Sequence, residues 1–196
     1  MPDFIDKLRL KEQADEDQYF ARRDRELIAA LRARRAWSLT RLVSGGQTGV
    51  DRAALDAALA QGIAVGGWCP KGRAAEDGVI PERYPLHETP SADPAQRTEW
   101  NVRDSDATLI LHRGALAGGT ALTAEAARRR GRPLLQLDLD AAPEPDIIDA
   151  WLRGQGVRVL NVAGPRESEA PGIGDLALDL LRRLLAVESK GAAGPA

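Results

Sequence analysis

Short apolar runs alternate with helical patterns from residue 39 onward, and this alternation dominates the sequence. In segment 51–61, for example, apolar side chains recur at helical spacing at Ala54, Leu55, Ala58 and Leu59 and predict one buried face. The predicted strands are 39–43, 63–68, 107–111, 133–139 and 157–162, and the predicted helices are 51–61, 94–103, 120–130, 146–153 and 175–187. Strands that alternate with helices are typical of βαβ units, so the pattern predicts an α/β fold with a mainly parallel sheet.

The two ends of the chain differ from this central domain, 39–188. Residues 1–36 carry 9 basic and 8 acidic side chains. Within them, Phe20, Leu27, Ile28 and Leu31 predict an amphipathic helix in an N-terminal extension, 1–38. We expect this helix to pack on the main domain or on a second subunit, since acids alternate with the bases and disfavour a nucleic-acid arm. Residues 189–196 have the composition of a disordered tail.

Composition and charge exclude several classes of function. The 27 basic and 29 acidic side chains give a net charge of −2, which lacks the concentrated positive field that nucleic-acid binding requires. The single cysteine, Cys69, cannot form an intrachain disulfide, and Cys and His are not spaced as in a zinc site. The sequence has no apolar signal region and no run near the roughly 18 apolar residues of a membrane span. We therefore expect a cytoplasmic protein without nucleic-acid or membrane partners.

Three glycine-containing turns each follow a predicted strand. They are SGGQTGVD at 44–51, GALAGGT at 114–120 and GPRES at 164–168. The first matches neither the GxGxxG fingerprint nor the P-loop, so neither a classical dinucleotide site nor a Mg-ATP site is indicated. Because the carboxyl ends of parallel strands meet at one edge, where backbone N–H groups and helix dipoles favour anions, the turns predict one shared anion-binding crevice.

Charged and polar side chains near the same edge extend this candidate site. Lys71 and Arg73 follow strand 63–68, and Arg166 lies in the third turn, where a guanidinium can clamp a phosphate or carboxylate. Arg97 and Asn101 are four residues apart and share a helical face.

Other residues allow two interpretations. One interpretation of Asp51 is an acid at the N-terminus of its helix. The other is an acceptor for a hydroxyl or N–H group of the ligand, since an acid would repel a phosphate. Cys69 is expected to be buried as a small apolar residue, and the alternative is contact with a soft metal. His87 and His112 have no neighbours that form a catalytic or metal pattern.

Several long strings in the chain resemble a known family. They are SGGQTGVDRAALDAA, GGWCPKGRAAEDGVIPERYPL, QRTEWNVRDSDATLIL, GGTALT and LNVAGPRESEAPGIG. On these strings the chain closely resembles the molybdenum carrier proteins, also described as the circularly permuted YpsA branch of the SLOG superfamily, over residues 39–187. The resemblance implies a Rossmann-like three-layer fold and a homo-oligomer, either dimer or tetramer. It also implies binding of molybdenum cofactor (molybdopterin), a pterin with a phosphate and a dithiolene-bound metal, and makes molybdoenzymes candidate partners.

A more distant similarity bears on catalysis. Residues 97–123 are similar to the lysine-decarboxylase-like (LONELY GUY) phosphoribohydrolases, which cleave nucleoside monophosphates at the N-glycosidic bond. In that family an Arg stands eight residues before Ser-Asp-Ala, as Arg97 stands before Ser105. The family motif Gly-Gly-x-Gly-Thr-x-x-Glu ends in the catalytic glutamate, but Thr123 takes that place here. The next acid, Glu125, is about 200° further round a helix, so binding without that hydrolysis is expected.

These observations predict a carrier or storage protein that binds a phosphorylated heterocycle. The family resemblance implies that this heterocycle is molybdenum cofactor. The alternatives are a nucleotide-binding sensor and an N-glycosidic phosphoribohydrolase that uses Glu125, Asp51 or Glu99. We expect no catalytic residue and no metal ligand. The predicted ligand-binding residues are Ser44, Gly45, Gly46, Thr48, Gly49, Asp51, Lys71, Arg73, Arg97, Asn101, Gly118, Gly119, Thr120 and Arg166.

Overall fold

The computed structural model describes residues 16, 18–20, 22–25 and 38–192, with side chains up to residue 186. The chain divides into two compact units, 1–37 and 38–196. In the first unit the described residues are helical. Three residues of the predicted amphipathic helix, Leu27, Ile28 and Leu31, lie outside the described residues. The second unit carries the sheet and the candidate site.

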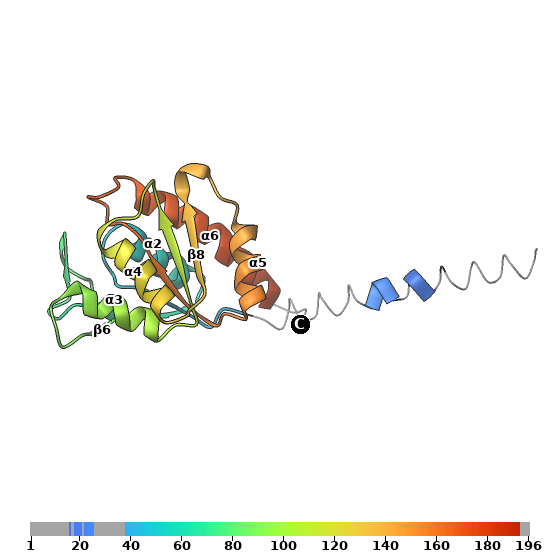
Figure 1. The fold of residues 1–196 in the computed structure, drawn as a ribbon, viewed down its shortest axis with the longest axis horizontal. Helices are drawn as coiled ribbons and strands as arrows, with labels where there is room; N and C mark the ends of the chain where they lie inside the picture. Colours follow the sequence, from blue (N-terminus) through green and yellow to red (C-terminus); the bar gives the residue numbers. More distant parts are fainter. Residues whose placement is uncertain (1–15, 17, 21, 26–37, 193–196) are drawn as a thin grey trace, which may run out of the picture. The chain divides into compact units, whose positions relative to one another are not determined.

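A five-stranded parallel sheet forms the centre of the second unit (Figure 1). Its strand order is β2-β1-β9-β7-β8. In chain order the strands are β1 (Arg41–Val43), β2 (Ala64–Gly66), β7 (Ala107–His112), β8 (Leu134–Asp138) and β9 (Val159–Ala163). Leu42 of β1 pairs with Val65 of β2 on one side and Leu160 of β9 on the other, and all three side chains are buried. The parallel α/β fold predicted from the apolar runs is confirmed.

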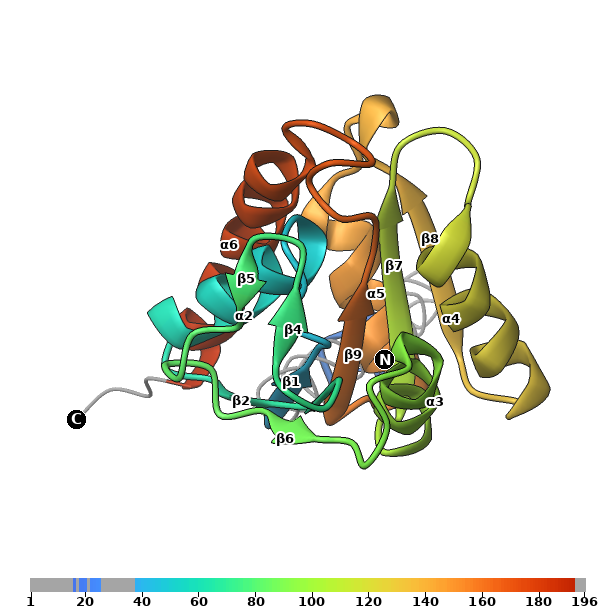
Figure 2. The same ribbon diagram turned by 90° about the vertical axis from the view of Figure 1, so that its left-hand side faces the viewer.

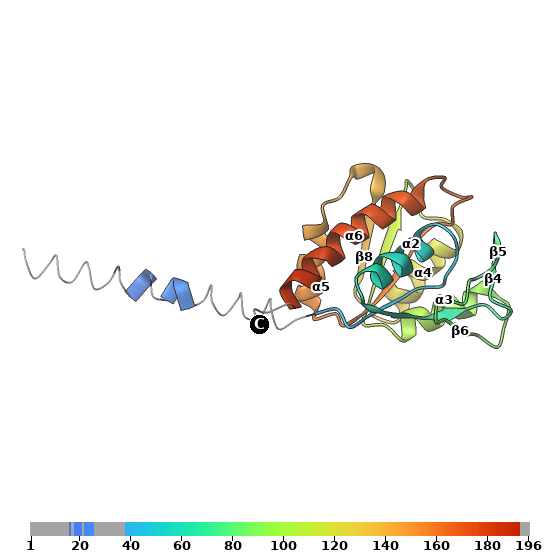
Figure 3. The same cartoon turned by 180° about the vertical axis from the view of Figure 1, so that it is seen from behind.

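Helices cover both faces of the sheet, which gives the three layers of a Rossmann-like fold (Figures 2 and 3). The helices are α2 (Val50–Ala60), α3 (Pro94–Arg103), α4 (Gly118–Arg129), the short 3₁₀ turn η1 (Leu139–Ala141), α5 (Pro145–Gln155) and α6 (Ile173–Ala192). Helices α2, α5 and α6 lie on one face, where α6 contacts both of the others, and α3 packs against α4 on the opposite face.

Alanines explain how closely α2 approaches its neighbours. Ala54 and Ala58 are fully buried, and small side chains let the helix lie near the leucines of α6, such as Leu181. Leu59, which the spacing placed on the buried face, is instead 41% exposed. The buried residues of α2 centre on its alanines, so Leu59 falls at the margin of the buried stripe.

The order of the strands determines where a ligand can bind. Strand β9 lies between β1 and β7. After β1 the chain continues through α2 to the edge strand β2, and after β7 it continues through α4 to the opposite edge strand β8. The connections thus diverge on either side of β9, and such a switch point leaves a crevice at the carboxyl ends of the strands.

The segment between the predicted strand 63–68 and the predicted helix 94–103 forms a loop that contains two short strand pairs. A parallel pair joins β3 (Trp68–Cys69) to β6 (His87–Glu88), and an antiparallel hairpin joins β4 (Ala74–Ala75) to β5 (Gly78–Val79). The backbone of Arg73, at φ 52°, lies in the left-handed region at the base of this hairpin.

The last helix is longer than its apolar pattern predicts. Helix α6 continues to Ala192 and so includes residues 189–192, which the composition assigned to a disordered tail. Residues 193–196 lie outside the described residues. Among the described helices, none combines the length and apolar character needed to cross a membrane.

Candidate functional site

A cavity of about 320 Å³ lies at the carboxyl ends of β1, β7 and β9, beside the first turns of α3 and α4. This volume is at the lower end of the range for small-molecule sites, roughly 300–1,000 Å³. The lining residues are Gly45, Gln47, Asp51, Pro70, Ala74, Asp93, Pro94, Ala95, Arg97, Thr98, Gly119, Thr120, Leu122, Thr123, Ala163, Gly164, Arg166 and Glu169. All three predicted turns contribute to the list, so the structure brings them together at one crevice.

The first and third turns touch directly. Gly49 has φ 71°, which favours glycine, and a Cβ built there would lie 2.5 Å from the carbonyl oxygen of Pro165. The N–H of Val50 donates to that same oxygen at 3.4 Å. Gly49 is therefore needed for the close contact between the two turns, and its role is to shape the crevice.

A buried ion pair forms one wall of the cavity. Nη1 of Arg97 lies 3.2 Å from Oδ2 of Asp51, and the two side chains are 16% and 2% exposed. Burial raises the pKa of Asp51, while Arg97 and the N–H of Gln47 oppose that shift. The Arg97 guanidinium crosses Gly45 so closely that a Cβ there would collide with it. Nε of Arg97 is buried and has no hydrogen-bond partner in the described part of the chain.

The start of α4 forms another wall and offers free backbone donors. No side chain of the described residues caps this helix, whose N-cap residue is Ala117. Within the described residues the N–H groups of Gly118 and Gly119 have no acceptor, and Gly119 lines the cavity. Unpaired N–H groups at a helix N-terminus, with the dipole of the helix, favour a bound anion.

The charged side chains of the cavity are largely paired with each other. Nε of Arg166 lies 3.1 Å from Oε1 of Glu169, and Arg97 pairs with Asp51. The lining residues include two arginines and three acids, Asp51, Asp93 and Glu169. Asp93 also caps α3, because its Oδ1 accepts from the N–H of Ala95 at 2.9 Å. The cavity is therefore not strongly basic, and its backbone amides become more important for binding an anion.

Two of the predicted phosphate ligands lie outside this cavity. Lys71 is exposed and is not among the lining residues. Arg73 donates instead to the carbonyl oxygens of Ile80, Pro81, Tyr84 and Leu86 at 2.9–3.1 Å. These bonds hold the 80–86 segment against the hairpin base, so Arg73 has a structural role in this arrangement.

Asn101 holds the backbone rather than facing the cavity. Its Oδ1 accepts from the N–H of Trp68 at 2.8 Å, and its Nδ2 donates to the carbonyl of the same residue at 2.9 Å. Asn101 lines a second cavity of about 320 Å³, together with Arg41, His87 and other residues of that side.

Four further predicted ligand-binding residues, Ser44, Gly46, Thr48 and Gly118, are not among the residues that line the cavity. Ser44 is fully buried and donates from Oγ to the carbonyl of Val162 at 2.7 Å. Gly46, with φ 77°, faces Leu86 and Ile80. Gly118 begins α4, and Thr48 belongs to a polar network at the rim of the cavity.

The three candidate carboxylates of a hydrolase occupy different places. Glu125 is 61% exposed and pairs with Arg129 on the surface of α4, and Glu99 also pairs with Arg129. Only Asp51 lines the cavity among these three. Thr123, in the position of the related family's glutamate, donates to the carbonyl of Gly119 at 2.9 Å within its own helix.

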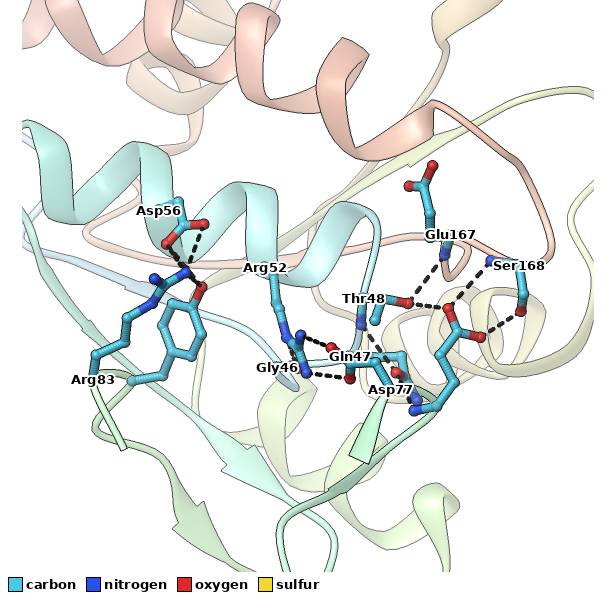
Figure 4. A network of polar contacts seen from close by, with 11 residues as sticks. Gly46, Gln47, Thr48, Arg52, Asp56, Asp77, Arg83, Glu167 and Ser168 are labelled. Atoms are coloured by element: carbon cyan, nitrogen blue, oxygen red, sulfur yellow. Dashed lines mark hydrogen bonds and ion pairs between the residues drawn. The ribbon is translucent and has the colours of Figure 1, made fainter. Parts of the chain in front are cut away.

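Sequence reasoning missed the polar network at the rim. Figure 4 shows Thr48 from the first turn close to Glu167 and Ser168 from the third. Glu76, in the hairpin, accepts hydrogen bonds from Thr48 and Ser168. Ser168 stands in one quoted string and Glu76 in another, but no spacing pattern connects them.

The described residues contain no group of three or more His, Cys, Asp or Glu side chains that could hold a metal ion. Cys69 is fully buried, and burial raises the pKa of its thiol. A protonated, inaccessible thiol is a poor metal ligand, which favours the packing interpretation of this residue.

Comparison with known proteins places these features in a family. A search of curated proteins gives no match. Among solved structures, the chain is similar to the "Putative molybdenum carrier protein" of Syntrophus aciditrophicus SB. The two are 48% identical with a TM-score of 0.73, and the match covers 75% of this chain and 95% of the other. Residues 42–185 match the circularly permutated YpsA SLOG family. This match spans most of the chain and includes all three turns, so the chain belongs to the circularly permutated YpsA SLOG family.

Proposed function

We propose that the cavity binds a phosphorylated heterocycle, molybdenum cofactor, and that the protein carries or stores it without changing it. The observation that carries this proposal is the meeting of three glycine-containing turns at one cavity, where the amides at the start of α4 have no acceptor within the described part of the chain. The name of the 48% identical structure gives the ligand class independent support.

The residues present fit such a ligand. The N–H groups of Gly118 and Gly119 would receive the phosphate, and the Thr120 hydroxyl lies in the same helical turn. Nε of Arg97 is a buried donor that has no partner among the described residues, and Asp51 offers an acceptor for N–H groups of a heterocycle. The metal would be cargo held by the dithiolene of the cofactor, so the protein need not supply metal ligands.

Copurification tests the proposal. The full chain, purified from cells that make the cofactor, should release a fluorescent pterin and contain molybdenum in near-stoichiometric amount. Light scattering on the same sample measures the homo-oligomer that we also propose. Absence of pterin and molybdenum, together with no binding of added cofactor, would exclude the carrier function.

A second candidate is hydrolysis of a nucleotide derivative at its N-glycosidic bond. The specific observation in its favour is Asp51, a buried carboxyl group in the cavity wall next to Arg97. A carboxylate is what such a reaction needs to stabilise an oxocarbenium-like transition state. Incubation with a panel of nucleoside monophosphates decides between the two. Free base formed by the wild type and absent with Asp51→Asn would replace the carrier proposal, whereas no free base from any substrate would exclude the hydrolase.

A further inference from the structure

The carboxylate of Glu76 is surrounded by donors from two of the three turns. Its Oε1 accepts from the Thr48 hydroxyl and from the N–H of Ser168 at 3.2 Å, and its Oε2 accepts from the Ser168 hydroxyl. Nε of Arg166 lies 3.9 Å from the same Oε2. Hydroxyl, amide and guanidinium donors that converge on one anionic group are typical of an oxyanion site.

The surroundings of Glu76 favour negative charge. Hydrogen bonds from Ser168 and Thr48 lower the pKa of its carboxyl group, and burial offsets only part of that effect. The Thr48 hydroxyl is itself held in place, because its oxygen also accepts from the N–H of Glu167 at 3.2 Å (Figure 4). The donors are thus already oriented around the place that an anion takes.

Glu76 reaches this place from a hairpin that is anchored by other residues. The β4–β5 hairpin has little apolar packing of its own, as Val79 at 71% exposure illustrates. Arg52 holds Asp77 through a bidentate ion pair, with one contact at 2.7 Å, and Oε1 of Gln47 accepts from the N–H of Glu76 at 3.0 Å. The Glu76 side chain can therefore leave its donors while the hairpin keeps its position.

We propose that Thr48, Ser168 and Arg166 form a subsite for a tetrahedral oxyanion of the phosphate type, and that Glu76 is an internal competitor for it. A phosphate has more charge and more acceptor oxygens than a carboxylate, so it can engage the same donors at once. Arg166 also lines the main cavity, so the subsite adjoins it. The inference goes beyond the proposed function, which assigns the single phosphate of the cofactor to the start of α4, so this subsite would take a separate phosphate-type oxyanion beside that ligand.

Calorimetric titration of the full chain with inorganic phosphate tests the subsite. Glu76→Gln removes the competing charge at nearly constant size. We expect this variant to bind phosphate about tenfold more tightly than the wild type, because the phosphate no longer has to replace a carboxylate as the acceptor for the Thr48 and Ser168 donors. Glu82→Gln is the matched control, since Glu82 is exposed in the same loop and loses the same charge. It should bind phosphate as the wild type does. In the Glu76→Gln background, Ser168→Ala should reverse the gain, with circular dichroism confirming the fold of each variant.

The two titrations test the oxyanion subsite and the proposed carrier function independently. Equal phosphate affinities for Glu76→Gln and Glu82→Gln, or no loss with Ser168→Ala, would overturn the subsite. A parallel titration with molybdenum cofactor tests the proposed function separately. Phosphate binding as expected without cofactor binding supports the subsite and overturns the proposed function. Cofactor binding that is unaffected by Glu76→Gln, with no change in phosphate affinity, overturns the subsite and supports the function.

Discussion

Replacing Gly119 by Asp should strongly weaken the binding of a phosphorylated ligand and leave the fold intact. Gly119 lies in the first turn of α4 and lines the cavity, and a Cβ built there meets no atom within 4 Å. The new side chain therefore has room, and a carboxylate in the first turn of a helix is favourable for the helix itself. The same carboxylate would stand beside the amides that we expect to hold the phosphate.

The size of the effect follows from Coulomb's law. Two like charges about 4 Å apart repel by about 1 kcal/mol in bulk water and about 4 kcal/mol near a protein surface. At about 1.4 kcal/mol per tenfold in Kd, the loss of affinity for a phosphorylated ligand is roughly fivefold to about 700-fold.

Gly119→Asn supplies the control, because asparagine has nearly the same size without the charge. Both variants are titrated with molybdenum cofactor at low and high salt, and the difference between them should shrink as salt screens the repulsion. Equal affinities of the two variants at low salt would refute the assignment of the phosphate to the start of α4.

Three further experiments test the surrounding structure. Gly49→Ala should lower the free energy of unfolding by more than Gly131→Ala, which costs about 1–2 kcal/mol from its positive φ alone. The excess has two sources, because the Gly49 backbone, at φ 71° and ψ −129°, suits glycine alone and its Cβ would also meet the backbone of the third turn. Urea denaturation measures both losses, and equal losses would contradict this placement of Gly49. The hydrogen bond from Arg52 lowers the pKa of Asp77, so the stabilisation that Asp77 provides is complete above its ordinary value of 3.8 and is lost as the pH falls through the lower folded value. Wild type and Asp77→Asn should therefore differ in unfolding free energy at pH 6 and converge in strong acid, and a difference that persists there would disprove the ion-pair origin. Cys69 should react with a thiol reagent only after denaturation, since it is buried and protonated; rapid labelling of the native protein would contradict this placement.

The fold and the position of the crevice could be predicted from the sequence because both depend on patterns that the chain repeats. Apolar runs and helical spacing specify a parallel sheet, and a parallel sheet brings the ends of its strands to one edge. The turns at 44–51, 114–120 and 164–168 therefore had to lie near one another, and the structure places residues of all three around one cavity.

The partners of individual side chains could not be predicted in the same way. Charge suggested a phosphate contact for Arg73, but four carbonyl groups of a nearby loop take its donors. Spacing put Arg97 and Asn101 on one helical face, yet Arg97 lines the main cavity while Asn101 holds the backbone of Trp68. Such choices depend on which loop packs nearby, and loop packing leaves no periodic signal in the sequence.

Pairing of charges also changes how an anion would be recognised. A net charge of −2 leaves room for a local basic pocket, but Arg97 and Arg166 each meet a carboxylate at the cavity. A ligand phosphate then gains little from these cations unless it replaces their acidic partners. The amides of α4 carry no such cost, because they have no acceptor to give up among the described residues. Affinity that comes from backbone donors and displaced carboxylates depends on the fit of one oxyanion more than on long-range attraction, as the proposed carrier function requires.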